Sequence, residues 1–103
     1  MKFGLPDKTI HKINSVFISI PEIDDVIIYG SRAKGNFREG SDIDITIKGE
    51  NISFKTLSKI NQDIDELNTP YLFDISIYDK LESIELVEHI NRVGQSFYKK
   101  KKI

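Results

Sequence analysis

The segment 42–48 alternates strictly between polar and apolar side chains, and this pattern limits the possible folds more than any other feature. Isoleucine occupies every second position, at Ile43, Ile45 and Ile47, and the residues between them are Asp42, Asp44, Thr46 and Lys48. Successive side chains of a β-strand point to opposite faces of the sheet. We therefore expect a half-buried strand whose isoleucine face lies on a core and whose other face, bearing both aspartates, stays open.

Helical and strand periodicities alternate along the rest of the chain. Apolar residues recur at helical spacing within 7–20, 54–67 and 81–92, and strand-like runs occupy 26–29 and 71–78. A short helical turn is expected from Ser31, and Gly94 would cap the last helix. That helix is expected to turn Ile84, Val87, Ile90 and Val93 toward the core. This order predicts an α/β (α+β) domain in which helices cover one face of a small mixed sheet.

Size and composition exclude several classes of protein. The 103 residues suit one domain, which we expect to span 1–98 and to be followed by a solvated basic tail, 99–103. The chain has 15 basic and 16 acidic residues, which argues against a strongly basic nucleic-acid binder. It has no cysteine, which excludes a disulfide scaffold and a thiolate metal site. Because neither a membrane-spanning run nor a signal peptide is evident, we expect a cytoplasmic protein without membrane contact.

Two aspartates on one strand face suggest a cation. The Cα atoms of Asp42 and Asp44 should lie about 6–7 Å apart, so their carboxylates repel unless positive charge lies between them. Mg²⁺ supplies such charge and prefers oxygen ligands. Asp74 stands on the polar side of the strand 71–78. If this strand neighbours the first, three carboxylates converge on one or two cations; taken alone, an Asp-x-Asp pair is more simply two solvated acids.

A glycine–serine pair follows the strand 26–29. Gly30 would let backbone N–H groups approach a phosphate closely, and Ser31 adds a hydroxyl donor. Positive charge is close by in the sequence, at Arg32, Lys34 and Arg38. The Walker pattern is absent, and the pair alone reads as an ordinary strand-to-helix turn.

Together these residues carry a family resemblance. The segments Gly30-Ser31-Arg32-Ala33-x-Gly35 and Ser41-Asp42-Ile43-Asp44 resemble the signature of the nucleotidyltransferase superfamily that includes DNA polymerase β. The chain is similar to the minimal stand-alone branch of that superfamily, the MNT domains. Asp74 matches the third carboxylate of the family, and the stretch 89–98 resembles an MNT C-terminus. The resemblance covers residues 7–98 and implies a palm-like fold of the polymerase β type.

The resemblance also implies roles for individual residues. It implies ATP or another nucleoside triphosphate as donor and Mg²⁺, as two ions, as cofactor. The implied catalytic residues and metal ligands are Asp42, Asp44 and Asp74. The implied nucleotide- and phosphate-binding residues are Gly30, Ser31, Arg32 and Ser41. The products would be pyrophosphate and a hydroxyl acceptor that carries a nucleoside monophosphate.

Members of this branch are often antitoxins. Their partner is a small helical HEPN protein, commonly an RNase toxin, and the resemblance implies transfer of AMP to a partner tyrosine. From the charge of the chain we expect no direct contact with nucleic acid. Two other functions stay open: a catalytically silent antitoxin that blocks a HEPN partner by contact, and a small-molecule nucleotidyltransferase. The complete set of acids argues against the first, and the absence of an extra helical domain from this sequence argues against the second.

The remaining polar and aromatic residues have ordinary interpretations. His11 and His89 are expected at the surface or the edge of the core, and two histidines without cysteine make a zinc site improbable. Tyr71 and Tyr78 flank Asp74 and either stack a base or fill the edge of the sheet.

Overall fold

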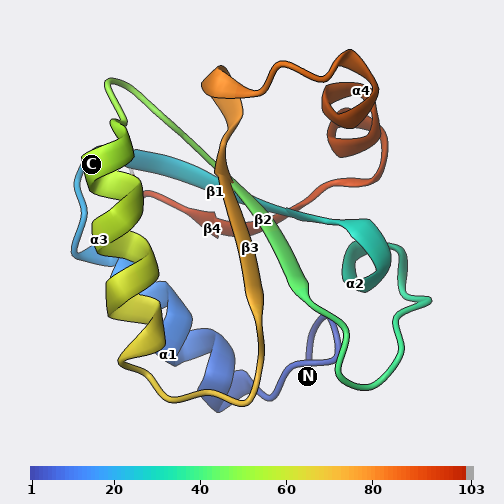
Figure 1. The fold of residues 1–103 in the computed structure, drawn as a ribbon. Helices are drawn as coiled ribbons and strands as arrows, with labels where there is room; N and C mark the ends of the chain where they lie inside the picture. The colour runs from blue at the N-terminus through green and yellow to red at the C-terminus, as the bar shows by residue number, and fades with distance from the viewer. Residues whose placement is uncertain (102–103) are drawn as a thin grey trace.

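The computed structural model describes residues 1–101, and the expected succession of helices and strands is present (Figure 1). The elements are α1 (Asp7–Ile18), β1 (Ile23–Tyr29), α2 (Gly30–Lys34), β2 (Ile43–Gly49), α3 (Phe54–Asp65), β3 (Phe73–Ile77), the 3₁₀ turn η1 (Tyr78–Lys80), α4 (Ile84–Val93) and β4 (Gln95–Lys99). The strand β4 is an addition to the expected set. Within the described residues, no helix has the length and apolar character needed to cross a membrane.

The sheet is mixed, as expected. Its strands lie in the order β3-β2-β1-β4, with β2 and β3 parallel and the other neighbours antiparallel. Residues paired directly across neighbouring strands point to the same face. The register therefore determines which side chains meet on the face that bears the aspartates.

The helices α1 and α3 cover the isoleucine face of the sheet. Ile43, Ile45 and Ile47 are fully buried there, as the alternation of β2 predicts. They join one core with apolar residues from both helices: Ile13, Val16, Phe17, Ile60 and Ile64. Figure 1 shows α1 and α3 together on one side of the sheet.

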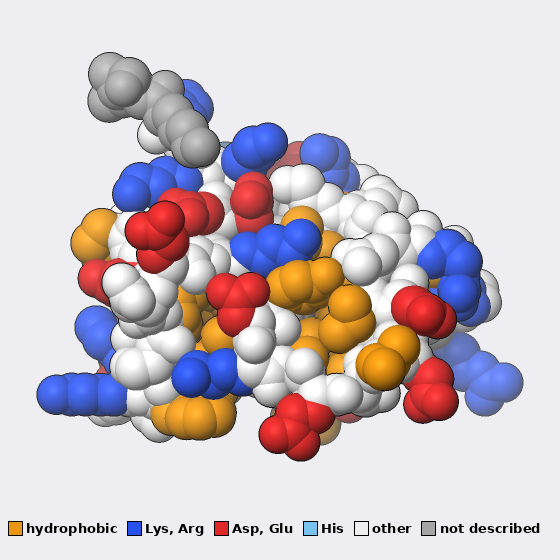
Figure 2. All heavy atoms as spheres, turned by 90° about the horizontal axis from the view of Figure 1, so that it is seen from above, with side chains coloured by type: hydrophobic (Ala, Val, Ile, Leu, Met, Phe, Trp, Pro, Cys, Tyr) orange, Lys and Arg blue, Asp and Glu red, His pale blue; other side chains and the backbone are white. Residues whose placement is uncertain are grey.

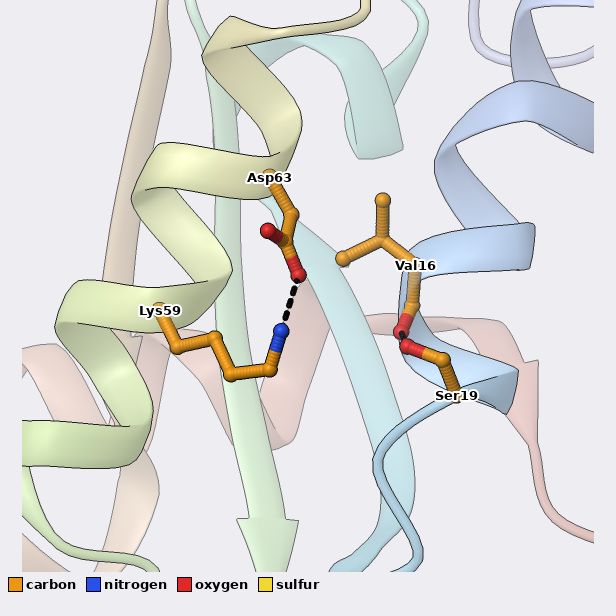
Figure 3. A network of polar contacts seen from close by, with 4 residues as sticks. All are labelled: Val16, Ser19, Lys59 and Asp63. Atoms are coloured by element: carbon orange, nitrogen blue, oxygen red, sulfur yellow. Dashed lines mark hydrogen bonds and ion pairs between the residues drawn. The ribbon is translucent and has the colours of Figure 1, made fainter.

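Local polar contacts support this helical layer. The Nζ of Lys59 lies 2.9 Å from Oδ2 of Asp63, one turn further along α3. The hydroxyl of Ser19 donates to the carbonyl of Val16 at 2.7 Å, at the C-terminal end of α1. Figure 3 shows both contacts where the two helices face each other. They belong to the layer that covers the core, so Asp63 offers a control carboxylate on a different element from the acids of the sheet.

The helix α4 lies on the opposite, acid-bearing face, over β1, whereas the sequence led us to expect helices on one face only. A Cβ added to Gly94 would lie 2.6 Å from Ile27, and the ring of His89 packs edge-on against Tyr29. Ile90 is buried at this contact, whereas Ile84 is 74% exposed, so the expectation that Ile84 faces the core was wrong. The helix begins only at Ile84, where the Ser83 side chain accepts the backbone N–H of Leu86, and its first residue points away from the sheet.

The strand β4 follows directly after α4. Gly94 has extended backbone angles (φ −63°, ψ 144°) and leads the chain into pairing with β1 instead of forming a left-handed cap. Phe97 is buried in the main core, beside the rings of Phe3 and Phe17. The strand ends at Lys99, the first residue of the expected tail, and residues 102 and 103 lie outside the described part of the chain.

Candidate functional site

Asp44 and Asp74 lie side by side on neighbouring strands. They are directly paired in the parallel register of β2 and β3, so both carboxylates point from the same face of the sheet. Asp42 precedes β2 by one residue and is exposed. Across β1, Tyr29 is paired with Asp44 and shares this face. The register therefore brings together two of the expected acids and places the third two residues from Asp44.

The electrostatics of Asp44 reflect this crowding. Partial burial raises the pKa of Asp44 above its ordinary value, and the negative charges of Asp74 and Asp42 raise it further, while His89 acts weakly in the opposite direction. Desolvation and like charge both disfavour an ionised carboxylate. A cation at this place would relieve both effects, because it restores favourable interactions to the charged form.

The donor chemistry of this face suits a hard divalent cation. Carboxylate oxygens are the ligands that Mg²⁺ prefers, and the acids contribute only such atoms. Among residues 1–101, however, no three histidine or acidic side chains are arranged as a ready-made metal-binding group. The assignment of Asp42, Asp44 and Asp74 as ligands therefore fits the chemistry of the site and stays a prediction.

The glycine–serine corner lies directly against Asp44. Gly30 has a positive φ of 73°, and a Cβ placed on it would lie 2.5 Å from Oδ2 of Asp44. Only glycine allows both this backbone conformation and this approach. Ser31 follows in the first turn of α2 and is partly exposed. The two parts of the sequence motif, separate along the chain, thus meet at one point.

Arg32 does not extend from this corner toward the acids. Its side chain is only 3% exposed, and its guanidinium donates to the carbonyl of Ser41 (Nε 3.1 Å, Nη2 2.8 Å) and to that of Phe3 (Nη1 2.9 Å). It also lies over the rings of Phe37 and Tyr71, at 5.0 and 5.2 Å. A buried guanidinium needs such partners, because its desolvation is costly. This geometry gives Arg32 a structural role, and its expected phosphate-binding role stays a prediction.

The side chain of Ser41 is likewise engaged within its own loop. Its hydroxyl accepts the backbone N–H of Arg38 at 2.9 Å and donates to the carbonyl of the same residue at 2.6 Å. Its carbonyl receives the bidentate contact from Arg32. Ser41 therefore anchors the loop that leads into β2, and its expected role as a phosphate ligand stays a prediction.

Sequence reasoning missed two features of this face: the position of Tyr29 beside Asp44, and the contact of His89 with Tyr29. Burial raises the pKa of Tyr29, Asp74 and Asp44 add to the rise, and the Ser76 side chain opposes it. The ring of His89 stands edge-on to Tyr29, with centroids 6.1 Å apart. His89 is at the core edge, as expected, but next to the candidate site. No alternation was visible in the wholly apolar run 26–29, so only the register with β2 reveals the position of Tyr29.

The tyrosines that flank Asp74 in the sequence have structural contacts of their own. The ring of Tyr71 packs on the guanidinium of Arg32, and the ring of Tyr78 lies 4.4 Å from the ammonium of Lys48. The hydroxyl of Tyr78 also donates to Asn91 of α4 at 3.1 Å. Of the two interpretations left open by the sequence, these contacts favour side chains that complete the edge of the sheet.

Comparison with known proteins identifies the family of the chain. The family described as "Polymerase beta, Nucleotidyltransferase" matches residues 11–103, and the chain belongs to that family. No curated protein matches the chain closely enough to count as a relative.

Three solved structures show the same fold. The crystal structure of a toxin-antitoxin with AMP-PNP matches this chain with a TM-score of 0.71 and 18% sequence identity, and the match covers 89% of this chain and 74% of that chain. The toxin-antitoxin MntA-HepT has a TM-score of 0.65 and 15% identity, with 92% and 74% covered. A nucleotidyltransferase candidate from Sulfolobus solfataricus has a TM-score of 0.52 and 21% identity, with 93% and 91% covered. At these identities the likeness establishes the fold, and the expected fold of the polymerase β type is confirmed.

Proposed function

We propose that this protein is a Mg²⁺-dependent nucleotidyltransferase that moves AMP from ATP to a hydroxyl group of a partner protein. The observation that carries the proposal is the meeting of Asp44, Asp74 and Gly30 at one corner of the sheet. Membership of the nucleotidyltransferase family supports the reaction class. The structure with AMP-PNP, a non-hydrolysable ATP analogue, supports ATP as donor, since its fold is the same.

The residues of the corner have separate tasks in this proposal. Asp42 and Asp44, with Asp74, would hold Mg²⁺, which when bound neutralises charge on the triphosphate. The Gly30 backbone and the Ser31 hydroxyl would bind the terminal phosphates. Asp74, the most exposed of the paired acids, would accept the proton of the acceptor hydroxyl.

The bonds that change follow from these tasks. The acceptor oxygen forms a bond to the α-phosphorus, and the bond from the α-phosphorus to the bridging oxygen of the β-phosphate breaks. The proton of the hydroxyl passes to the carboxylate of Asp74, and pyrophosphate leaves with the electron pair of the broken bond. No oxidant or further reactant is required.

A partner protein is the proposed source of the acceptor. Two of the structures with this fold are described as toxin-antitoxin structures, one of them as the pair MntA-HepT. We extend this pairing to the present chain: the acceptor is a tyrosine of a HEPN-type toxin, and its modification would make this chain the antitoxin. The open β2–β3 end of the acid-bearing face leaves room for such a partner, because α4 packs over β1.

A catalytically silent antitoxin is the second candidate. It is favoured by the lack, within residues 1–101, of a ready-made group of metal ligands, and by the structural engagement of Arg32 and Ser41. In that case the chain would inhibit its partner by binding alone.

Labelled ATP separates the two candidates. The protein is incubated with Mg²⁺, the product of the adjacent gene and ATP labelled in either the α- or the γ-phosphate. Nucleotidyl transfer predicts that only the α-label reaches the partner, and that Asp44→Asn abolishes it. Asp63→Asn removes a carboxylate from α3 instead and should leave the transfer intact. A tight complex without label would support the silent antitoxin.

A further inference from the structure

The two edges of the sheet differ in their protection. Edge strands expose unpaired backbone groups, and proteins commonly blunt them with lysines or bulges. The β4 edge has both: the register with β1 shifts between Val26 and Ile27, and the strand ends in Lys99. Lys100 adds a second lysine at the end of this strand, where its N–H donates to the Asp24 carbonyl and its Nζ to that of Pro21.

The β3 edge has no such protection. Its sequence, Phe-Asp-Ile-Ser-Ile, contains neither lysine nor proline, and its pairing with β2 runs without a register shift. The N–H of Ile43 donates to the carbonyl of Leu72 at 2.8 Å, which fixes the residues whose backbone groups turn toward β2. In a parallel ladder alternate residues bond to the neighbouring strand. Leu72, Asp74 and Ser76 therefore face β2, and the N–H and C=O groups of Phe73 and Ile75 and the N–H of Ile77 face outward.

The outward backbone groups of β3 are available for pairing. In residues 1–101 no turn, loop or cap hydrogen bond involves Phe73 or Ile75, whereas the C=O of Ile77, the N-cap of η1, accepts the first bond of that turn. Leu72, just before the strand, is 73% exposed, and the side chains of Phe73 and Ile75 are only half buried at the rim of the core. An additional strand would thus gain both hydrogen bonds and apolar contact.

The side chains of β3 also determine what such a strand would carry. Asp74 points to the acid-bearing face, where Asp42 and Asp44 add negative charge. A residue directly opposite Asp74 on an added strand would have its Cβ about 4.5–5.5 Å away, within reach of the carboxylate. Its neighbours on that strand would point to the other face, toward Phe73 and Ile75. The charge of the acid face favours basic residues on the same side of the strand.

We propose that the outer edge of β3 binds an extended segment of the acceptor protein by β-strand addition. The segment alternates apolar residues with basic or hydroxyl-bearing ones and places its acceptor hydroxyl opposite Asp74. This inference rests on the proposed function, since it identifies the acceptor of that same site as a strand-forming segment. The backbone ladder supplies the affinity, and the register against Asp74 selects the hydroxyl that reacts.

Amide hydrogen exchange of the full chain provides the first test. The probe is a synthetic peptide of alternating valine and lysine with one central tyrosine, and its control has alternate backbone amides N-methylated. The peptide should slow exchange at Phe73, Ile75 and Ile77 at least tenfold, while Asp74 and Ser76, bonded to β2, exchange slowly with or without it. The methylated peptide should bind at least tenfold more weakly. Equal binding of both peptides, or unchanged exchange at the three outward amides, would overturn the proposal.

Variants of Ile75 provide the second test. Ile75→Pro removes an outward N–H without removing a bond to β2, a position where an edge strand tolerates proline. Ile75→Ala removes side-chain volume but keeps the N–H. The proline variant should bind the peptide at least tenfold more weakly than the alanine variant; equal affinities would contradict strand addition. If the proline variant does not fold, the exchange experiment still decides the question.

The outcomes separate this inference from the proposed function. Peptide protection of the β3 amides without transfer of AMP to its tyrosine, in the presence of ATP and Mg²⁺, would support the edge and contradict the reaction. Transfer without protection would support the reaction and contradict the edge. Concentration-dependent dimers of this chain that protect the same amides would also overturn the proposal, because the occupant would then be a second copy.

Discussion

The α-carbon of Gly30 faces the carboxylate of Asp44 at a distance that leaves no space for a side chain. A Cβ there would lie 2.5 Å from Oδ2. Gly30→Ala should therefore displace Asp44 in addition to straining a backbone with φ of 73°. We expect a loss of roughly 2–4 kcal/mol in the free energy of unfolding, as strain and overpacking add. Urea denaturation measures it.

Gly35 provides a matched control for this substitution. Its φ is also positive, at 86°, but a Cβ placed on it would meet no atom within 4 Å. Gly35→Ala should thus cost only the backbone strain, about 1–2 kcal/mol. Equal losses for the two alanine variants would show that the contact between Gly30 and Asp44 contributes nothing.

Neutralising Asp44 should stabilise the metal-free protein. Burial and the charges of Asp74 and Asp42 raise the pKa of Asp44 above its ordinary value of 3.8, so ionisation of this carboxyl opposes folding. This loss of stability from ionising Asp44 is absent below pH 3.8. It grows as the pH rises toward the folded-state pKa and is complete at neutral pH. Asp44→Asn should therefore raise stability at pH 7 by less than about 1 kcal/mol, given solvent screening, and the gain should vanish near pH 3.

Asp63→Asn should change the free energy of unfolding in the opposite direction, toward lower stability. This carboxylate is paired with Lys59 at 2.9 Å, so its loss should cost about 0.3–0.5 kcal/mol. Thermal unfolding of both variants with EDTA at pH 7 and pH 3 tests the contrast. A large loss of stability in metal-free Asp44→Asn would show that this carboxylate holds the fold together.

The structural role of Arg32 leads to a third prediction. Its guanidinium makes three hydrogen bonds to carbonyls and packs between the rings of Phe37 and Tyr71. Arg32→Lys keeps the charge but loses the bidentate contact to Ser41 and the planar stacking. We expect it to lower the free energy of unfolding by about 2–4 kcal/mol without any nucleotide present, because buried polar groups lose their partners.

Lys34, an exposed residue of the same short helix, serves as the comparison. Lys34→Ala should change stability by less than about 0.5 kcal/mol, as surface substitutions generally do. Phosphate binding by Arg32 would give a different result, in which the fold of Arg32→Lys is intact and only its affinity for ATP falls. Chemical denaturation and nucleotide titration of the same samples distinguish the two roles.

The sequence predicted those features that local periodicity encodes. The alternation of β2 correctly assigned its isoleucines to the core and Asp44 to the other face, whereas Asp42 precedes the strand. Helical spacing identified an apolar stripe on α4 but could not say which face of the sheet it covers. Ile84 was misplaced because the helix begins only at this residue. The charge of Arg32 next to Gly30 is compatible with a phosphate or a loop carbonyl as its partner, and only the three-dimensional structure reveals the bond to the Ser41 carbonyl. Likewise, the pairing of Asp44 with Asp74 depends on which strands are neighbours.

The strand β4 was missed because its sequence, Gln-Ser-Phe-Tyr-Lys, does not alternate, yet it supplies a large buried side chain. Phe97 is 7% exposed and contacts the rings of Phe3 and Phe17, with centroids 6.0 and 6.3 Å away. Phe97→Ala should leave a cavity and cost about 3–5 kcal/mol. Ser96→Ala, at an exposed position on the same strand, should have little effect. If residues after Gly94 were only a frayed end, Phe97→Ala would unfold at the same urea concentration as the unmodified chain.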